Sequence, residues 1–292
     1  MQKVIDKAKV LIEALPYIQK FRGAIVVVKF GGSAMEDRKL IAQIMKDIVF
    51  MECVGMKPVV VHGGGKAISA RLKELQIPTE FINGLRYTCD KTIKVVDDVL
   101  HNVVNADLVN AVKEAGGKGK TMSGKTFLKA ARATTKCSET GKEIDLGYVG
   151  DVVKVNQTQI IDALDSGVLP VIAPLALDEH GDTYNINADI AACRIAKAIK
   201  ARKLVFLSDV PGILRNPDDE KSIISTITVD EVDQLIDSGV ISGGMAPKIK
   251  SAEDALRAGT RKVHIIDGRV RHSLLLEIFT DSGIGTEIIR NK

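Results

Sequence analysis

Short apolar runs rich in β-branched residues alternate along the chain with stretches whose apolar residues recur at helical spacing. Each apolar run leads into a glycine-containing turn and then a helical pattern; the runs are residues 24–30, 58–61, 168–173, 204–207 and 263–266. Strands that alternate with helices are typical of an α/β protein, in which helices cover both faces of a largely parallel sheet. We therefore predict a three-layer sandwich with a central, mainly parallel sheet.

Two regions depart from this alternation. Residues 4–15 place apolar side chains on one face at helical spacing, and Pro16 should end or kink that helix. This N-terminal helix precedes the first strand and has no obvious core partner, so it either caps the fold or docks on another subunit. Residues 125–158 hold short pieces of alternating polarity, which predict hairpins at the edge of the sheet.

The chain of 292 residues is long enough for two lobes, and no repeat or low-complexity linker separates them. We expect the two lobes to share one continuous sheet, with a boundary near residues 178–182. The predicted divisions are an N-terminal helix (1–22), an N-terminal lobe (23–179) and a C-terminal lobe (180–292).

The composition excludes or disfavours several classes of protein. Hydrophobic residues make up 45% of the chain and charged residues 27%, which excludes a disordered chain. The net charge of +4 is spread along the sequence, so a basic nucleic-acid patch is not indicated. No apolar run reaches the ~18 residues of a membrane span, and the first residues lack the long apolar run and small-residue cleavage site typical of a signal peptide. The four cysteines are far apart, which favours free thiols and a cytoplasmic protein.

Glycine-rich turns mark where a ligand should bind, because ligands of parallel sheets lie beyond the carboxyl ends of strands. One turn holds Lys29, Gly31 and Gly32, and the next runs from His62 through three glycines to Lys66. Glycines allow backbone N–H groups to face an anion, and a lysine adds a point charge. Either turn could instead be purely structural, and we interpret His62 as a buried structural residue.

Three further segments carry candidate chemistry. Arg86 could clamp a carboxylate in bidentate fashion, although a lone arginine is often a surface residue. Asn185 and Asp189 precede a helix, where they could bind a substrate and position lysines or simply cap the helix. Lys248 follows Gly244 at a helix start, and two lysines that converge there could neutralise a phosphoryl group in transfer.

Residues 119–126 match the G-x-x-x-x-G-K-[ST] pattern of a P-loop, and the strand before Asp209 resembles its usual companion. A P-loop must follow a strand and open a helix. The stretch before this pattern, Val103–Glu114, has helical periodicity, which disfavours the P-loop interpretation.

Eight segments together resemble the amino-acid kinase superfamily and, within it, the acetylglutamate kinase family. From about residue 24 to the C-terminus they are VVVKFGGSAM, VVVHGGGKAIS, FINGLRYT, DLGYVGDV, LPVIAPLA, YNINAD, LVFLSDVPGIL and ISGGMAPKI. The resemblance implies transfer of the ATP γ-phosphoryl group to the side-chain carboxylate of N-acetyl-L-glutamate, an arginine-biosynthesis step. The attacking carboxylate is already ionised at pH 7, so no general base is expected.

The resemblance also implies site residues. Lys29 and Lys248 match the lysines that stabilise the transferring group, and Asp189 matches the aspartate that organises them. The matches to acetylglutamate contacts are Gly64, Gly65, Arg86 and Asn185. The C-terminal lobe would bind MgATP, with Mg²⁺ carried by the nucleotide and no resident metal; the nucleotide contacts would be Gly31, Gly32, Ser208, Asp209, Leu214 and Gly244.

The N-terminal helix resembles the extension of arginine-inhibited members, in which such helices join three dimers into a hexamer. We therefore expect inhibition by arginine, in a pocket lined by Tyr17, Lys203, Glu277, Gly283 and Gly285. Whether a PII signalling protein binds is left open. The chain departs from the family pattern at Cys89, near the substrate, and at Thr126-Phe127, in the hairpin region.

Besides a P-loop protein, two alternatives stay open at this point. Another amino-acid kinase would act on aspartate, glutamate, carbamate or UMP, but the pairing of N-G-L-R with Y-N-I-N-A-D disfavours it. A catalytically weak arginine sensor would have no need of the phosphoryl clamp made by Lys29, Lys248 and Asp189.

Overall fold

The computed structural model describes residues 1–136, 141–280 and 283–291. Its centre is an eight-stranded sheet with the order β12–β14–β13–β11–β1–β2–β8–β5. Neighbouring strands are parallel except at the β13–β14 pair. The strands are β1 (Ile25–Phe30), β2 (Lys57–His62), β5 (Gly119–Ser123), β8 (Leu169–Ala173), β11 (Lys203–Ser208), β12 (Thr226–Thr228), β13 (Lys262–Asp267) and β14 (Thr286–Ile289).

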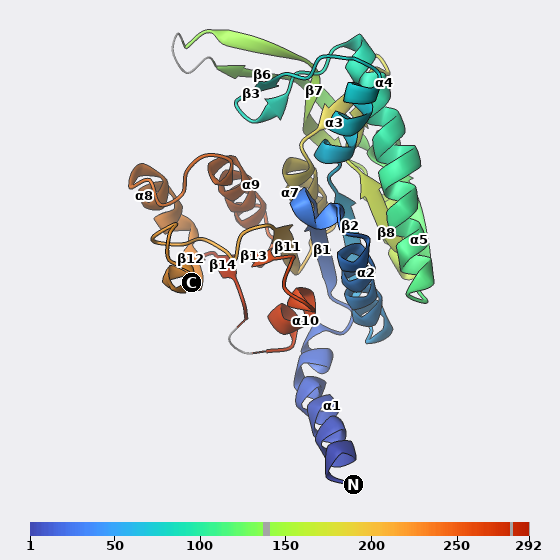
Figure 1. Cartoon of the computed structure of the whole chain (residues 1–292), viewed down its shortest axis with the longest axis vertical. Coiled ribbons are helices and arrows are strands. Elements are labelled where there is room, and N and C mark those ends of the chain that lie inside the picture. Colours follow the sequence, from blue (N-terminus) through green and yellow to red (C-terminus); the bar gives the residue numbers. More distant parts are fainter. Residues whose placement is uncertain (137–140, 281–282, 292) are drawn as a thin grey trace.

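Helices cover both faces of this sheet, which confirms the three-layer α/β prediction (Figure 1). Alternate residues of β1 point to opposite faces: Val27 belongs to one buried cluster, and Val26 and Val28 to the other. The first cluster is covered by α6 (Thr158–Asp165), α7 (Ala188–Ala198), α8 (Val232–Asp237) and α9 (Met245–Arg257). The second is covered by α2 (Arg38–Cys53), α3 (Gly65–Glu74), α4 (Asp90–Asp98), the π-helix η2 (Val99–Asn105), α5 (Ala106–Glu114) and α10 (Ser273–Ile278).

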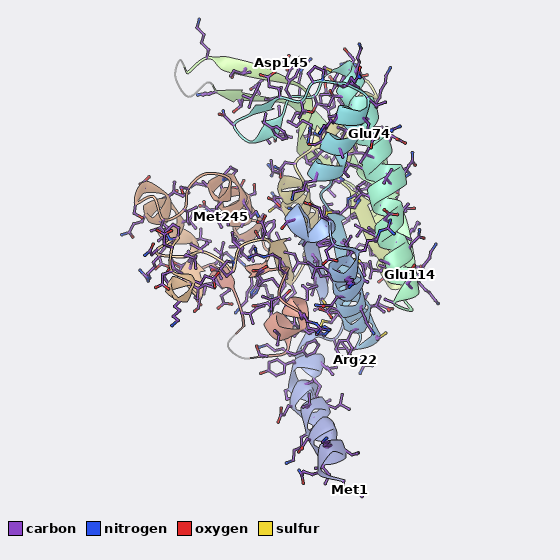
Figure 2. All side chains as sticks on the ribbon, viewed as in Figure 1. Met1, Arg22, Glu74, Glu114, Asp145 and Met245 are labelled. Atoms are coloured by element: carbon purple, nitrogen blue, oxygen red, sulfur yellow. The ribbon has the colours of Figure 1, made fainter. Side chains whose placement is uncertain are left out.

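The N-terminal helix α1 (Gln2–Phe21) projects from the body of the molecule. It continues through Pro16, so of the two predicted alternatives Pro16 does not end the helix, and a kink at Pro16 stays a prediction. The hydrogen bond that proline cannot donate would go to the carbonyl of Ile12. Ile12 is 68% exposed, so water can satisfy that carbonyl. Figure 2 shows the helix reaching away from the rest of the chain toward Met1, whereas at its other end Phe21 is buried and Tyr17 packs on Phe279.

The predicted hairpins form, but in a sheet of their own. Strands β6 (Leu128–Lys136) and β7 (Glu143–Val155) pair antiparallel and close a four-stranded sheet with β9 (Leu175–Leu177) and β10 (Thr183–Ile186). The 3₁₀ turn η3 (Gly124–Thr126) redirects the chain out of β5. A Cβ on Gly124 would lie 2.1 Å from the Leu175 carbonyl oxygen, so only glycine allows this crossing. The hairpins therefore leave the edge of the central sheet instead of extending it.

The remaining short elements are β3 (Phe81–Ile82), β4 (Leu85–Arg86) and the 3₁₀ turns η1 (Gly32–Met35), η4 (Glu220–Ser222) and η5 (Val229–Glu231). The predicted lobe boundary at 179–180 falls between β9 and β10, and the division into lobes stays a prediction. Within the described ranges, no helix is long and apolar enough to cross a membrane. Cys53, Cys89 and Cys193 are free thiols, and Cys137 lies outside the described residues.

Candidate functional site

Three charged side chains from separate elements meet at the carboxyl end of β1. Lys29 lies on β1, Asp189 in the first turn of α7 and Lys248 in the first turn of α9. The Nζ of Lys29 is 2.8 Å from one Asp189 oxygen, and the Nζ of Lys248 is 3.9 Å from the other. The three side chains are only 12–17% exposed. The structure thus brings together all three residues that the sequence proposes for catalysis.

The cluster carries two cations and one carboxylate, so it has an excess positive charge in a mostly buried place. Burial lowers the pKa of Lys248; Asp189 opposes this effect, and the nearby charge of Lys29 adds to it. A negatively charged group placed between the two lysines would relieve their repulsion. The site therefore suits a phosphoryl group whose charge grows during transfer.

The helix cap fixes the position of Asp189. The side chain of Asn187 accepts hydrogen bonds from the backbone N–H groups of Asp189 (2.8 Å) and Ile190 (3.3 Å). This is the capping role that the sequence offered as an alternative, and here Asn187 performs it. Asp189 is left free to face the lysines.

The two glycine turns lie against each other beside the lysines. A Cβ on Gly31 would lie 2.8 Å from the Nζ of Lys29 and 3.7 Å from the Cα of Gly63. Gly31 therefore leaves room for the lysine to fold back over its own turn. Gly32 has a φ of +74° and lies near Asp209, whose carboxylate is 3.7 Å from the position of a Gly32 Cβ. The first glycine turn thus touches both the lysine cluster and the end of β11.

A cavity of about 670 Å³ opens beside the second glycine turn. Arg86 lines it together with Gly64 and Gly65, and it is only 6% exposed. Its Nη2 donates to the Gly65 carbonyl (2.9 Å) and the Ser69 hydroxyl (2.7 Å), whereas its Nη1 is buried without a partner. Burial lowers the pKa of Arg86, yet a guanidinium remains charged. The unpaired nitrogen is suited to an anionic ligand.

Asn185 joins this group through a residue that sequence reasoning missed. Its side-chain amide donates to the hydroxyl of Thr88 at 3.4 Å, and that hydroxyl donates to the carbonyl of Arg86 at 2.9 Å. Thr88 is fully buried. A threonine beside a substrate motif carries no distinctive sequence signal, and only the structure shows that it links Arg86 to Asn185.

The residues proposed for the nucleotide lie along the C-terminal half of the sheet. Ser208 ends β11 and Asp209 follows it, beside Gly32. Gly244 caps the N-terminus of α9, four residues before Lys248. Leu214 lies further along the loop, where its backbone pairs with Ile223. Ser208, Asp209 and Gly244 therefore flank the lysine cluster, and Leu214 is placed more distantly.

The two departures from the family pattern have structural roles. Cys89 precedes α4, and its sulfur lies 3.3 Å from the Thr92 hydroxyl; this hydrogen bond lowers the pKa of the thiol. Thr126 donates to the Ser123 carbonyl at 3.0 Å, and Phe127 is buried in the core.

The P-loop-like segment does not form a P-loop. Its first residues are strand β5, and its lysine, Lys125, pairs with Asp97 at 2.6 Å. Among the described residues, no group of three or more His, Cys, Asp or Glu side chains is arranged to hold a metal ion.

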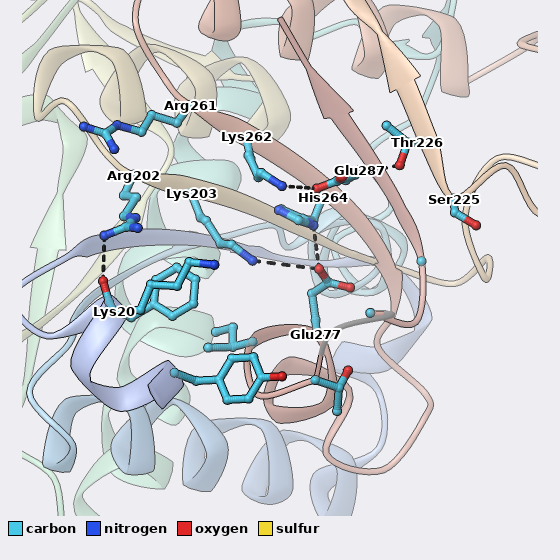
Figure 3. A pocket seen from close by; sticks show the side chains of 16 residues that line it. Lys20, Arg202, Lys203, Ser225, Thr226, Arg261, Lys262, His264, Glu277 and Glu287 are labelled. Atoms are coloured by element: carbon cyan, nitrogen blue, oxygen red, sulfur yellow. Dashed lines mark hydrogen bonds and ion pairs between the residues drawn. The ribbon is translucent and has the colours of Figure 1, made fainter. Parts of the chain in front are cut away.

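A second cavity, of about 380 Å³, lies at the amino ends of β11 and β13, where Lys203 and Lys262 begin these strands (Figure 3). It is lined by all five residues named for the arginine pocket, which are Tyr17, Lys203, Glu277, Gly283 and Gly285. Glu277 lies at its centre, with its Oε1 2.6 Å from His264 Nδ1 and 3.9 Å from Lys203 Nζ.

Burial and charge shape the groups around Glu277. Burial lowers the pKa of Lys203 to about 8, although the Glu277 charge opposes the shift. Burial would raise the pKa of Glu277, but the hydrogen bond with His264 and nearby charges hold it below its usual value. His264 was missed from the sequence, where a histidine within an otherwise apolar strand was the available signal.

Known proteins resemble this chain over nearly its whole length. Residues 24–267 match the model of the amino acid kinase family. Acetylglutamate kinase of Carboxydothermus hydrogenoformans is 50% identical over 290 residues, which cover 98% of this chain and 99% of that protein.

Solved structures agree with this placement. N-acetylglutamate synthase from Neisseria gonorrhoeae, in complex with coenzyme A and N-acetyl-glutamate, superposes with a TM-score of 0.85 at 26% identity. The match covers 98% of this chain and 64% of the synthase chain, so this chain spans less than two thirds of that enzyme. A complex of the synthase with coenzyme A and L-arginine has a TM-score of 0.79 at 26% identity, over 97% of this chain and 65% of the synthase chain.

The paired lysines, the two glycine turns and the full-length similarity agree with one another: the chain belongs to the amino acid kinase family, among the acetylglutamate kinases.

Proposed function

We propose that this enzyme transfers the γ-phosphoryl group of ATP to the side-chain carboxylate of N-acetyl-L-glutamate, as the name of its relatives indicates. The products are N-acetyl-L-glutamyl 5-phosphate and ADP, in a step of arginine biosynthesis. The observation that carries the proposal is the pair of lysines held by Asp189 beside two glycine turns.

The reaction brings two anions together. A carboxylate oxygen of the substrate attacks the γ-phosphorus, and the bond from that phosphorus to the β–γ bridging oxygen breaks. Lys29 and Lys248 offset the charge on the transferring group, while Asp189 holds their ammonium groups apart. The attacking carboxylate is ionised at pH 7, so these residues need not remove a proton.

The substrate is proposed to occupy the 670 Å³ cavity. The unpaired Nη1 of Arg86 and the amide of Asn185 would hold the carboxylate that does not react. Gly64 and Gly65 open α3, and their N–H groups would face the reacting carboxylate.

ATP is proposed to bind as its Mg²⁺ complex on the other side of the lysines. Gly31 and Gly32 would face the phosphates, and Ser208, Asp209, Leu214 and Gly244 would lie along the nucleotide. The Mg²⁺ carried by the nucleotide would supply further positive charge against its phosphates.

Arginine is proposed to inhibit the enzyme from the second cavity. Its guanidinium would pair with Glu277, whose carboxylate stays ionised, and its carboxylate would face Lys203. Tyr17 of α1 also lines this cavity, so the helix and the pocket are joined. A pure arginine sensor is the second candidate function, and this cavity is what favours it.

The enzyme is also proposed to be a cytoplasmic hexamer, a trimer of dimers joined through α1. Leu11 and Ile12 of that helix are 69% and 68% exposed, which an isolated subunit would not favour. A PII signalling protein is a further candidate partner. Light scattering of the full chain and of a variant without residues 1–22 tests the assembly; an unchanged mass would contradict it.

ATP turnover tests the proposed reaction. The acyl phosphate is trapped as hydroxamate with N-acetylglutamate, glutamate, aspartate or carbamate as acceptor, and with UMP in a coupled ADP assay. We expect product from N-acetylglutamate and a loss of product on adding arginine. Product from another acceptor would contradict the substrate assignment, and arginine binding without any turnover would favour the sensor.

A further inference from the structure

His62 is a buried histidine that the proposed reaction does not use. It ends β2, immediately before the three glycines of the second turn, and it is fully buried. Both ring nitrogens have partners: Nδ1 lies 2.8 Å from the Gly63 carbonyl oxygen, and Nε2 lies 3.1 Å from the amide nitrogen of Asn105. The imidazole therefore connects the glycine turn to the π-helix η2.

Asn105 and the Gly63 carbonyl together determine which nitrogen of His62 carries the proton. Its amide nitrogen also donates to the Val171 carbonyl at 2.9 Å, and this contact fixes the amide orientation because a carbonyl only accepts. The same nitrogen faces Nε2 of His62, so Nε2 must accept. The proton then lies on Nδ1, which donates to the Gly63 carbonyl. Burial lowers the pKa of His62 to about 4, so the ring is neutral at pH 7.

The hydrogen bond to Gly63 orients the next peptide. In a trans peptide the C=O and N–H groups point in opposite directions, so holding the Gly63 oxygen toward His62 turns the Gly64 N–H away from it. Gly64 lines the cavity proposed for the substrate. The preceding peptide is held as well, because the Gly63 N–H donates to the Phe30 carbonyl at 2.7 Å.

The π-helix η2 supports the turn from a second direction. A Cβ on Gly64 would lie 2.5 Å from Cδ2 of Leu100, which shows how closely η2 packs against the turn. Leu100 and Asn105 both belong to η2, whose wide turns are a common feature of functional sites. One seven-residue segment thus contacts the glycine turn directly and through His62.

We propose that His62 and Asn105 are positioning residues: the hydrogen bonds from Asn105 to His62, and from His62 to the Gly63 carbonyl, aim the Gly64 N–H at the reacting carboxylate of the substrate. This inference rests on the proposed function. Flexible glycines cannot hold a donor in place by themselves, since their backbone adopts many conformations. The histidine supplies the missing constraint without touching the substrate.

The kinetic test uses two substitutions of similar size. His62→Leu removes the donor to Gly63, whereas His62→Asn places an amide N–H near the position of Nδ1. Loss of one oriented donor lowers turnover by about 10²-fold. We expect His62→Leu to lower kcat/KM for N-acetylglutamate by about that factor while KM for ATP changes little, and His62→Asn to recover most of the loss.

Two outcomes would overturn the inference: equal activities of the Leu and Asn variants, or a normal kcat/KM for His62→Leu. His180→Leu serves as the control, because the His180 side chain is 75% exposed. The parent enzyme is assayed first. An inactive parent would contradict the proposed function, whereas an active parent with insensitive variants would contradict only the positioning role.

The tautomer can be measured without turnover, which covers the case in which His62→Leu fails to fold. The chain has five histidines, so solid-state ¹⁵N NMR of histidine-labelled enzyme gives few signals. We expect His62 to be neutral with the proton on Nδ1. In Asn105→Asp the new carboxylate accepts at Nε2 while the Gly63 carbonyl still accepts at Nδ1, so the ring should gain a second proton, on Nε2, and become an imidazolium. A parent His62 protonated on Nε2, or an Nε2 that stays unprotonated in Asn105→Asp, would overturn the inference.

Discussion

Two clusters of this molecule place one carboxylate among basic groups, and they lie at opposite ends of the same strands. Asp189 faces Lys29 and Lys248 at the carboxyl ends of β1 and β11, whereas Glu277 faces Lys203, the first residue of β11. Asp189 is flanked by glycine turns that leave room for a ligand.

Glu277 is held more tightly. Its Oε2 accepts from the Ile284 N–H at 3.1 Å, and His264 approaches its other oxygen. A carboxylate among basic groups therefore suits two different ligands. At the Asp189 end of the sheet it suits a phosphoryl group that is being transferred, and at the Glu277 end it suits a cation that stays bound. The backbone around each carboxylate makes the difference.

We expect the largest effect when a cation is removed from the Asp189 cluster. Lys29→Met keeps the length of the side chain but removes its charge, so the transferring phosphoryl group loses one of two cations. We expect kcat to fall by about 10³-fold, with a smaller change in KM for either substrate. Hydroxamate formation measures this, with the exposed Lys120→Met as control. A loss below tenfold would mean that Lys29 is not part of the phosphoryl clamp.

The matching change at the other cluster is Glu277→Gln. It removes the negative charge proposed to pair with a guanidinium and leaves a side chain of the same shape. We expect the arginine concentration for half inhibition to rise by about 10²-fold, since a charge-assisted bidentate pair is lost. The ratio of turnover with and without arginine is measured, so any change in basal rate cancels. Unchanged inhibition would place arginine elsewhere.

The burial of Lys203 can be tested through the pH dependence of the free energy of unfolding. Its pKa in the folded protein is about 8, below the ordinary value of 10.5, so the unfolded chain binds the proton more tightly. The cost to stability is therefore largest below pH 8 and disappears as pH rises through 10.5. Between pH 7.5 and 9.5 the free energy of unfolding should rise by about 2 kcal/mol relative to Lys203→Met. Denaturant titrations measure this, and parallel pH profiles of the two proteins would contradict it.

We expect the smallest effect when the link between Arg86 and Asn185 in the proposed substrate site is removed. Thr88→Val keeps the shape but removes the hydroxyl between Asn185 and Arg86, leaving the Arg86 carbonyl without that donor. We expect kcat/KM for N-acetylglutamate to fall by about tenfold, and Thr88→Ser to restore it. If serine fails to restore activity, the methyl group rather than the hydroxyl positions this segment.

Most of the central sheet was predictable because its signals are local. Alternating apolar runs and glycine turns gave five of its eight strands (β1, β2, β8, β11 and β13) to within about two residues, and they gave the position of Lys29 at the end of β1. The short strands β5, β12 and β14 were not predicted. The hairpins were harder to predict. Local alternation gave their pairing, but their separate sheet depends on the close approach of Gly124 to Leu175, 51 positions later in the chain. The sequence also left open whether Pro16 ends or kinks its helix, because the exposure of Ile12, which allows the helix to continue, was not visible in it.

The sequence by itself determined the residue types and their order: the two lysines, the two glycine turns, Arg86, and the motifs that indicate the family. The family resemblance already predicted that Asp189 organises Lys29 and Lys248, and the tertiary structure supplied the distances. Only the tertiary structure decided that Thr88 joins Arg86 to Asn185 and that Asn105 faces Nε2 of His62. The physical reason is that hydrogen bonds and ion pairs act over a few ångströms in space. Residues 43 or 160 positions apart in the chain carry no local signal of such contacts.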